Sequence, residues 1–109
     1  MAGDWLVTAG QLGVVDGELA DGIEAQTVQC MANLRTLLEG EGSSMDAIIK
    51  TTVFLADIAD WPAMNGPYLA ALGDNRPARS AFAVGALPRG ALVEIEAWAF
   101  VGTSADEEG

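Results

Sequence analysis

The sequence contains no histidine and only one cysteine, Cys30, among its 109 residues. Without histidine, neither a Ser-His-Asp triad nor a Cys-His pair can form, and the commonest metal ligand is missing. A zinc site would have to be built almost entirely from carboxylates, so we expect no metal. A single cysteine cannot form an intrachain disulfide, and the cytoplasm is therefore the expected location.

Positive charge is also scarce, with 5 basic against 16 acidic residues and a net charge of −11. Such a surface repels phosphate backbones and anionic lipid, so we expect neither nucleic acid nor membrane as a partner. Apolar runs such as residues 53–56 are too short to span a bilayer. The sequence also has no glycine-rich phosphate loop and no visible signal peptide. Polar chemistry must rest on arginine, lysine, carboxylates, hydroxyls and backbone groups.

Length and hydrophobic patterning predict one domain over residues 1–101, followed by a disordered acidic tail over 102–109. The first half predicts a strand at 5–9, a hairpin of strands 14–15 and 18–19 around Asp16-Gly17, and a helix over 22–41. Asp21 is the expected helix cap, with Glu24 in a capping-box position. Cys30 lies in the apolar stripe of this helix, which favours a small buried side chain over a reactive thiol.

The second half predicts three more strands and a second helix. Residues 47–57 are apolar at both odd and even positions, which favours a central strand covered on both faces. A helix is expected from Asp60 to Gly73, bent at Gly66-Pro67. Strands at 79–86 and 91–101 follow, with a turn at 87–90 between them. This order predicts an α+β fold with two helices on one face of a single sheet.

The last strand has two unlike faces. One is small and aliphatic, from Val93 to Val101 at alternate positions, and suits packing against helices. The other mixes carboxylates with large aromatic side chains: Glu94, Glu96, Trp98 and Phe100. A solvent-facing strand rarely combines these, so we expect the chain to self-associate through this face of the sheet.

Arg79 is the most promising candidate for a functional cation. It follows Pro77-Ala78 at the opening of an apolar strand, where a fixed guanidinium fork would match a carboxylate. The alternative is a structural salt bridge with Glu94 or Glu96. These two glutamates point to the same side and could divide acid and base roles, or could satisfy basic residues at an interface.

Several short motifs occur in a characteristic order: Thr8-Ala9-Gly10-Gln11, residues 50–57 (KTTVFLAD), Met64-Asn65-Gly66-Pro67-Tyr68, Pro77-Ala78-Arg79-Ser80 and Glu94-Ile95-Glu96-Ala97. Together they resemble the Rid family of reactive-intermediate deaminases, over about residues 3–101. The resemblance implies a chorismate-mutase-like α+β fold, with a mixed sheet and two helices on one face. It also implies a homotrimer whose sheets form a central barrel, with sites in the clefts between subunits.

The resemblance further implies cofactor-independent hydrolysis of 2-aminoacrylate or 2-iminopropanoate to pyruvate and ammonia, as in a 2-iminobutanoate/2-iminopropanoate deaminase. Arg79 corresponds to the arginine that clamps the substrate carboxylate, and Glu94 to the glutamate that positions or activates water. Gly10 lies in a strand whose backbone lines the pocket, and Asn65 lies near the site on the second helix. The partner is then a small imine or enamine that bears a carboxylate.

Two departures from the family pattern bear on the substrate. Members usually have a longer N-terminal segment with an aromatic residue that closes the pocket, so that either the start lies upstream or the pocket is more open here. Many deaminating members also have cysteine where this chain has Ala81, a position that contacts substrate through its backbone. The alternatives are a Rid-fold hydrolase with a different small acid as substrate, and a protein that only binds small carboxylates. The family has also been described as endoribonuclease, which the net charge disfavours.

Overall fold

The computed structural model describes residues 4–101. In this part of the chain, two α-helices, α1 (Ile23–Gly40) and α2 (Trp61–Leu72), and three short 3-10 helices accompany seven strands. The strands are β1 (Asp4–Val7), β2 (Gln11–Leu12), β3 (Val14–Val15), β4 (Glu18–Leu19), β5 (Ile48–Leu55), β6 (Ala78–Ala83) and β7 (Val93–Val101). The predicted α+β class is confirmed. The predicted tail, residues 102–109, lies outside the described residues.

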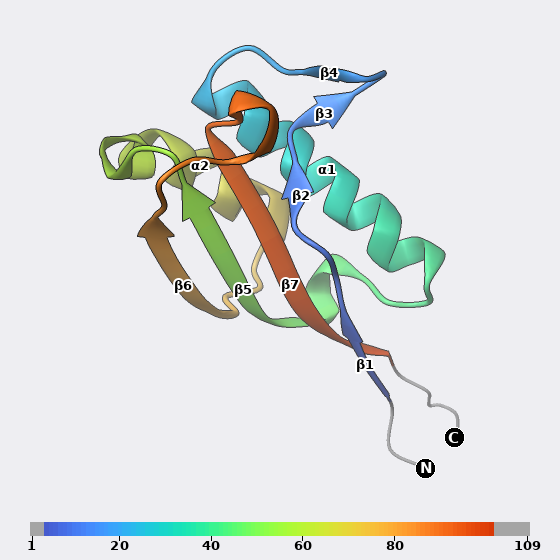
Figure 1. The fold of residues 1–109 in the computed structure, drawn as a ribbon. Helices are drawn as coiled ribbons and strands as arrows, with labels where there is room; N and C mark the ends of the chain where they lie inside the picture. Colours follow the sequence, from blue (N-terminus) through green and yellow to red (C-terminus); the bar gives the residue numbers. More distant parts are fainter. Residues whose placement is uncertain (1–3, 102–109) are drawn as a thin grey trace, which may run out of the picture.

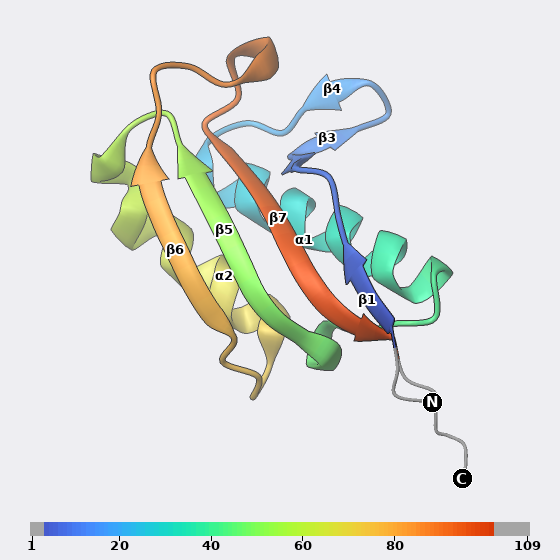
Figure 2. The same ribbon diagram turned by 60° about the horizontal axis from the view of Figure 1, so that its bottom comes forward.

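The main sheet is mixed and has the strand order β1-β7-β5-β6, with β2 also paired to β7. Strands β5 and β6 run parallel because α2 forms the crossover between them, whereas β7 is antiparallel to β5, β1 and β2. Both helices lie on the same face of this sheet, and the β3–β4 hairpin projects from one end (Figures 1 and 2). The predicted arrangement of two helices on one face is therefore confirmed.

The core lies between the helices and the sheet. From β7 it receives the predicted aliphatic face, in which Val93, Ile95, Ala97 and Ala99 are all 0% exposed. Strand β5 contributes Thr51, Val53 and Leu55, which pair with β6 in register. The helices add the buried side chains Cys30, Met31, Leu34, Leu38, Met64, Tyr68 and Leu72. Alternation along the strands thus sorts the side chains of the sheet into a covered set and an uncovered set.

The opposite side of the sheet, which we call the open face, carries large apolar side chains with no covering layer from this chain. Trp5, Val7, Phe82, Trp98 and Phe100 are between 37% and 57% exposed. Two edge-to-face aromatic pairs, Trp5–Phe100 and Phe54–Phe82, run across it, each with ring centres 5.3 Å apart. A surface of this kind is typical of a protein–protein contact.

The expectation that residues 47–57 form a strand covered on both faces is wrong. Strand β5 is shorter, and its side chains at Lys50, Thr52 and Phe54 are only partly buried on the open face. A register shift between Ile48 and Lys50 moves the buried positions from even to odd numbers. This irregularity makes the sequence look apolar at both parities although only one face is covered.

Local signals at the turns and helix ends gave mixed results. The Asp16-Gly17 hairpin is confirmed, with φ angles of 54° and 81° at the two turn residues. The expected cap by Asp21 is wrong, because Gly22 caps α1 with a φ of 91° and no side chain bonds to the helix end. Helix α2 continues through Pro67 as a single helix, and the expected bend at Gly66-Pro67 stays a prediction. No helix in residues 4–101 has the length and apolar character needed to cross a bilayer.

The buried hydroxyl pair of Thr51 and Tyr68 gives a stability prediction. Their oxygen atoms lie 2.6 Å apart and both side chains are at most 2% exposed, so each hydroxyl depends on the other. Thr51→Val should lower the free energy of unfolding by about 1–3 kcal/mol, because the Tyr68 hydroxyl loses its buried partner. Urea unfolding measures this loss. The control, Thr52→Val on the open face, should change stability far less, and equal losses in both variants would contradict the assignment.

Candidate active site

Arg79 lies under helix α2 rather than on the open face. It pairs with the buried Thr51 across β5 and β6, which directs its side chain toward the helices. Its guanidinium carbon lies 4.4 Å from the ring centre of Trp61 and 4.6 Å from that of Tyr68, within the range of cation–π attraction. Nη1 donates a hydrogen bond of 2.7 Å to Oδ1 of Asn65. Three side chains of one helix therefore orient this cation.

The spacing of these α2 residues explains the arrangement. Asn65 lies four residues after Trp61, and Tyr68 lies three residues after Asn65. The three side chains therefore project from one side of the helix toward β6. Tyr68 is itself held by its hydroxyl contact with Thr51. Asn65 could be named from the sequence motifs, whereas Trp61 and Tyr68 were not predicted as partners of Arg79. The signal that could have identified them is their spacing on one side of α2.

The alternative of a structural salt bridge between Arg79 and Glu94 or Glu96 is wrong for this subunit. Within residues 4–101 the ion pair found is Arg35–Glu39, at 3.8 Å between half-exposed side chains. Glu94 and Glu96 pair with Phe54 and Thr52, whose side chains lie on the open face. Arg79 and the two glutamates thus point to opposite sides of the sheet, and the guanidinium has no carboxylate partner in the described part of the chain.

Glu94 lies directly against the backbone of Gly10. A Cβ atom added at Gly10 would overlap the Glu94 carboxylate, so only glycine leaves room for this contact. The resemblance implied that Gly10 lies in a strand, and the structure corrects this, because Gly10 lies in the link between β1 and β2. The strand expected over 5–9 stops at Val7 because Thr8 uses its own hydroxyl to accept a bond from the Ala97 amide, at 2.9 Å.

The predicted site residues thus form two groups in one chain. Arg79, Asn65 and Ala81 lie on the helix side, with Ala81 half-buried beside Val53. Gly10 and Glu94 lie together on the open side. The first group can hold a carboxylate and the second can hold or deprotonate water. Within the described residues no three carboxylate or thiol groups come close enough for a metal site, and the absence of a cofactor stays a prediction.

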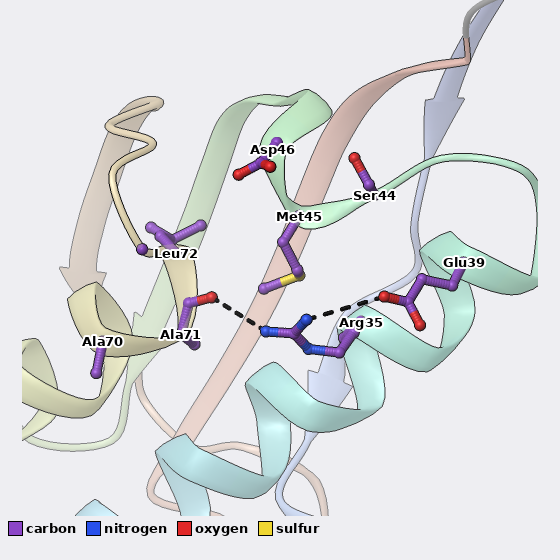
Figure 3. A pocket seen from close by; sticks show the side chains of 9 residues that line it. Arg35, Glu39, Ser44, Met45, Asp46, Ala70, Ala71 and Leu72 are labelled. Atoms are coloured by element: carbon purple, nitrogen blue, oxygen red, sulfur yellow. Dashed lines mark hydrogen bonds and ion pairs between the residues drawn. The ribbon is translucent and has the colours of Figure 1, made fainter.

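Two surface cavities lie elsewhere, in the groove between α1 and α2. One has a volume of about 300 Å³ and contains the Arg35 side chain, which reaches from α1 toward the Ala71 carbonyl (Figure 3). Glu39, Ser44 and Asp46 line the same cavity. The other, about 310 Å³, is lined mainly by apolar residues such as Val28 and Pro67. Neither cavity includes any of the predicted site residues.

Comparison with known proteins decides the family. The family model described as Endoribonuclease L-PSP matches residues 1–101. The chain belongs to the Rid family. It is 41% identical to a RutC family protein of Pyrococcus horikoshii over 102 residues, which cover 91% of this chain and 81% of that one. It is 38% identical to the 2-iminobutanoate/2-iminopropanoate deaminase of Rattus norvegicus, over 89% of this chain and 73% of that one.

The solved structures of Rid proteins agree with the fold described above. The crystal structure of RidA from the Antarctic bacterium Psychrobacter sp. PAMC 21119 has a TM-score of 0.87 with this chain at 35% identity. The match covers 93% of this chain and 84% of the RidA chain. The family membership indicated by the sequence motifs is therefore confirmed.

Cys30 gives a prediction about pH. Burial, with a smaller contribution from the negative charge of Glu94, raises the pKa of the Cys30 thiol from 9.0 to about 12. The unfolded chain therefore loses this proton at lower pH than the folded chain, so the thiol's contribution to stability is complete below pH 9 and is lost as the pH rises toward 12. At pH 10 the loss should be on the order of 1 kcal/mol.

Urea unfolding at pH 8, 9 and 10 measures this loss. The Cys30→Ala variant should be less stable than the wild type at every pH. Because it lacks the thiol, its free energy of unfolding should fall less steeply between pH 8 and pH 10. Parallel pH profiles for the two proteins would contradict the raised pKa.

Proposed function

We propose that this chain is a cofactor-independent deaminase that hydrolyses small imine or enamine acids, such as 2-iminopropanoate and 2-aminoacrylate, to pyruvate and ammonia. The observation that carries the proposal is the orientation of Arg79 by Trp61, Tyr68 and Asn65, with no carboxylate partner among residues 4–101. An oriented guanidinium fork is suited to a ligand carboxylate. Deaminases among the relatives, and the shared order of motifs, support the same function.

The chemistry requires few groups. An imine next to a carboxylate already has an electrophilic carbon, so the protein has to orient it and supply water. Arg79 binds the carboxylate, and Glu94 accepts a proton as the water oxygen bonds to the imine carbon. Glu94 passes this proton to the imine nitrogen, which becomes an amine on a tetrahedral carbon that also carries the new hydroxyl. The hydroxyl proton then moves through Glu94 to the nitrogen as the carbon forms a carbonyl and the carbon–nitrogen bond breaks, which releases ammonia and leaves Glu94 ionised.

One subunit does not supply both groups to the same molecule in this mechanism. Arg79 and Glu94 point to opposite sides of the sheet, and packed layers on a sheet lie about 10 Å apart. We infer that a neighbouring subunit completes the site, in a homotrimer with the barrel of chorismate-mutase-like proteins. The exposed aromatic residues of the open face support this assembly, because contact between copies would bury them.

The choice of substrate is influenced by Ala81. Its methyl side chain lies half-buried, two residues beyond Arg79, at the position where the family resemblance implies a cysteine in many deaminases. This difference favours, as a second candidate, hydrolysis of a different small acid by the same groups. RNA is disfavoured as a substrate by the net charge of −11. The cytoplasmic location stays a prediction, and some relatives are named as mitochondrial.

Replacement of Arg79 tests the proposed clamp. Arg79→Ala should lower kcat/KM for an enzymatically generated 2-aminoacrylate pool by about 100-fold or more, because the carboxylate loses a charge-assisted bidentate contact. Arg79→Lys should recover little of this loss, since an ammonium group lacks the planar fork. Pyruvate release, corrected for spontaneous hydrolysis, measures both variants.

The matched control is Arg76→Ala, because among residues 4–101 Arg76 bonds only to the backbone carbonyls of Gly73 and Asn75. It removes the same charge nearby and should leave kcat/KM unchanged. Unaltered turnover in Arg79→Ala would refute the mechanism. RNA cleavage at physiological salt by purified wild-type protein, lost in Arg79→Ala, would favour a nuclease instead.

A charge on the open face tests the assembly. Trp98 is 44% exposed between Val7 and Lys50, in the middle of this face. Trp98→Glu should convert a trimer into monomers by sedimentation analysis and abolish imine hydrolysis, because a contact between copies would bury the new carboxylate without a partner. Val28→Glu introduces the same charge at an exposed position on α1 and should keep both properties. A monomeric wild-type protein, or a trimeric Trp98→Glu variant, would contradict the proposed assembly.

A further inference from the structure

The side of α1 that faces the sheet carries three polar residues in a row, Gln26, Cys30 and Asn33. They are four and three residues apart, so they align along the helix. Gln26 is 5% exposed and Cys30 is fully buried, while Asn33 is half-buried. Polar groups in a helix–sheet interface cost free energy unless they are hydrogen-bonded, so their partners indicate what they hold.

Two of these residues hold the segment that follows Gly10. Asn33 Nδ2 donates to the backbone carbonyls of Leu12 and Val14, each at 3.0 Å, and Gln29 orients the amide by donating to Asn33 Oδ1 at 2.8 Å. The Cys30 thiol donates to the Gln11 carbonyl at 3.2 Å. Helix side chains therefore bind carbonyl groups of this short segment in addition to its pairing with β7.

Gln26 holds the segment that leads to Glu94. Its Oε1 accepts a hydrogen bond of 2.9 Å from the Leu92 amide, and its Nε2 donates to the Ala20 carbonyl at 3.0 Å. Leu92 directly precedes β7 and lies two residues before Glu94. The same helix face is thus connected to both chain segments that meet where Glu94 lies against Gly10.

We propose that Asn33, Cys30 and Gln26 are positioning residues that fix the Glu94 carboxylate against the Gly10 backbone. This inference rests on the proposed function of Glu94 in activating water. The carbonyls of Gln11 and Leu12 directly follow Gly10, and Leu12 pairs with Glu94 across β2 and β7. Loss of these bonds lets the segment move away from β7, and the glutamate then no longer holds its geometry relative to the water.

A split between kcat and KM tests the proposal. Asn33→Ala and Cys30→Ala should each lower kcat by about 10-fold or more, because small displacements of a reacting group are costly. KM should change little, since Arg79 lies across the sheet on β6 and contacts none of these residues. Cys30→Ser keeps a hydroxyl donor of similar reach and should restore most of the kcat lost in Cys30→Ala.

The matched control is Thr27→Ala on the same helix. Thr27 is fully buried, and its hydroxyl donates only to the Ile23 carbonyl within α1, at 2.8 Å. This variant should lose stability as the others do but keep wild-type kcat. Unchanged kcat in both Asn33→Ala and Cys30→Ala would overturn the proposal, as would an equal loss of kcat in Thr27→Ala.

A second readout separates this inference from the proposed function. If the wild-type protein hydrolyses no imine, the proposed function fails, and backbone amide NMR shifts then decide the positioning role. Asn33→Ala should shift the amide signals of Gly10 and Glu94, and Thr27→Ala should leave them in place. Unshifted signals in Asn33→Ala would overturn the positioning role whatever the activity of the protein.

Discussion

Helices cover only one face of the sheet, and most other features of the molecule depend on this constraint. The covered face takes the small aliphatic side chains of β7 and the buried positions of β5. The uncovered face keeps the aromatic residues and both glutamates of β7. Because side chains alternate along a strand, the same alternation that builds the core also assigns Arg79 and Glu94 to different sides. The proposed division of the site between subunits follows from this packing.

The sequence predicted those features that depend on short-range patterns. The Asp16-Gly17 turn could be predicted because both residues tolerate positive φ, and the two faces of β7 could be predicted from strict alternation. Two of the wrong expectations arose where the backbone departs from a regular pattern. Because of the register shift after Ile48, the sequence of β5 did not indicate that only one of its faces is covered. At the start of α1, Gly22 is the capping residue, although the sequence suggested a side-chain cap by Asp21.

The candidate site was predictable as a set of residues but not as a geometry. The order of the motifs identified Arg79, Glu94, Gly10 and Asn65 without any contact being known. The contact of Trp61 and Tyr68 with Arg79 joins residues on a helix and a later strand, and it depends on how α2 lies on β6. The fit of Glu94 against Gly10 depends on the pairing of two distant segments. Such distances are set by tertiary packing, which local propensity does not encode.

The burial of Cys30 also has a practical consequence. Its thiol is the only one in the chain, it is fully buried, and it keeps its proton throughout the neutral range. Thiol reagents attack the thiolate, so they can modify this residue only after α1 has separated from the sheet. The rate of labelling therefore reports how often the helix lifts away from β2. The protein carries an internal probe for opening at the place where Gly10 and Glu94 meet.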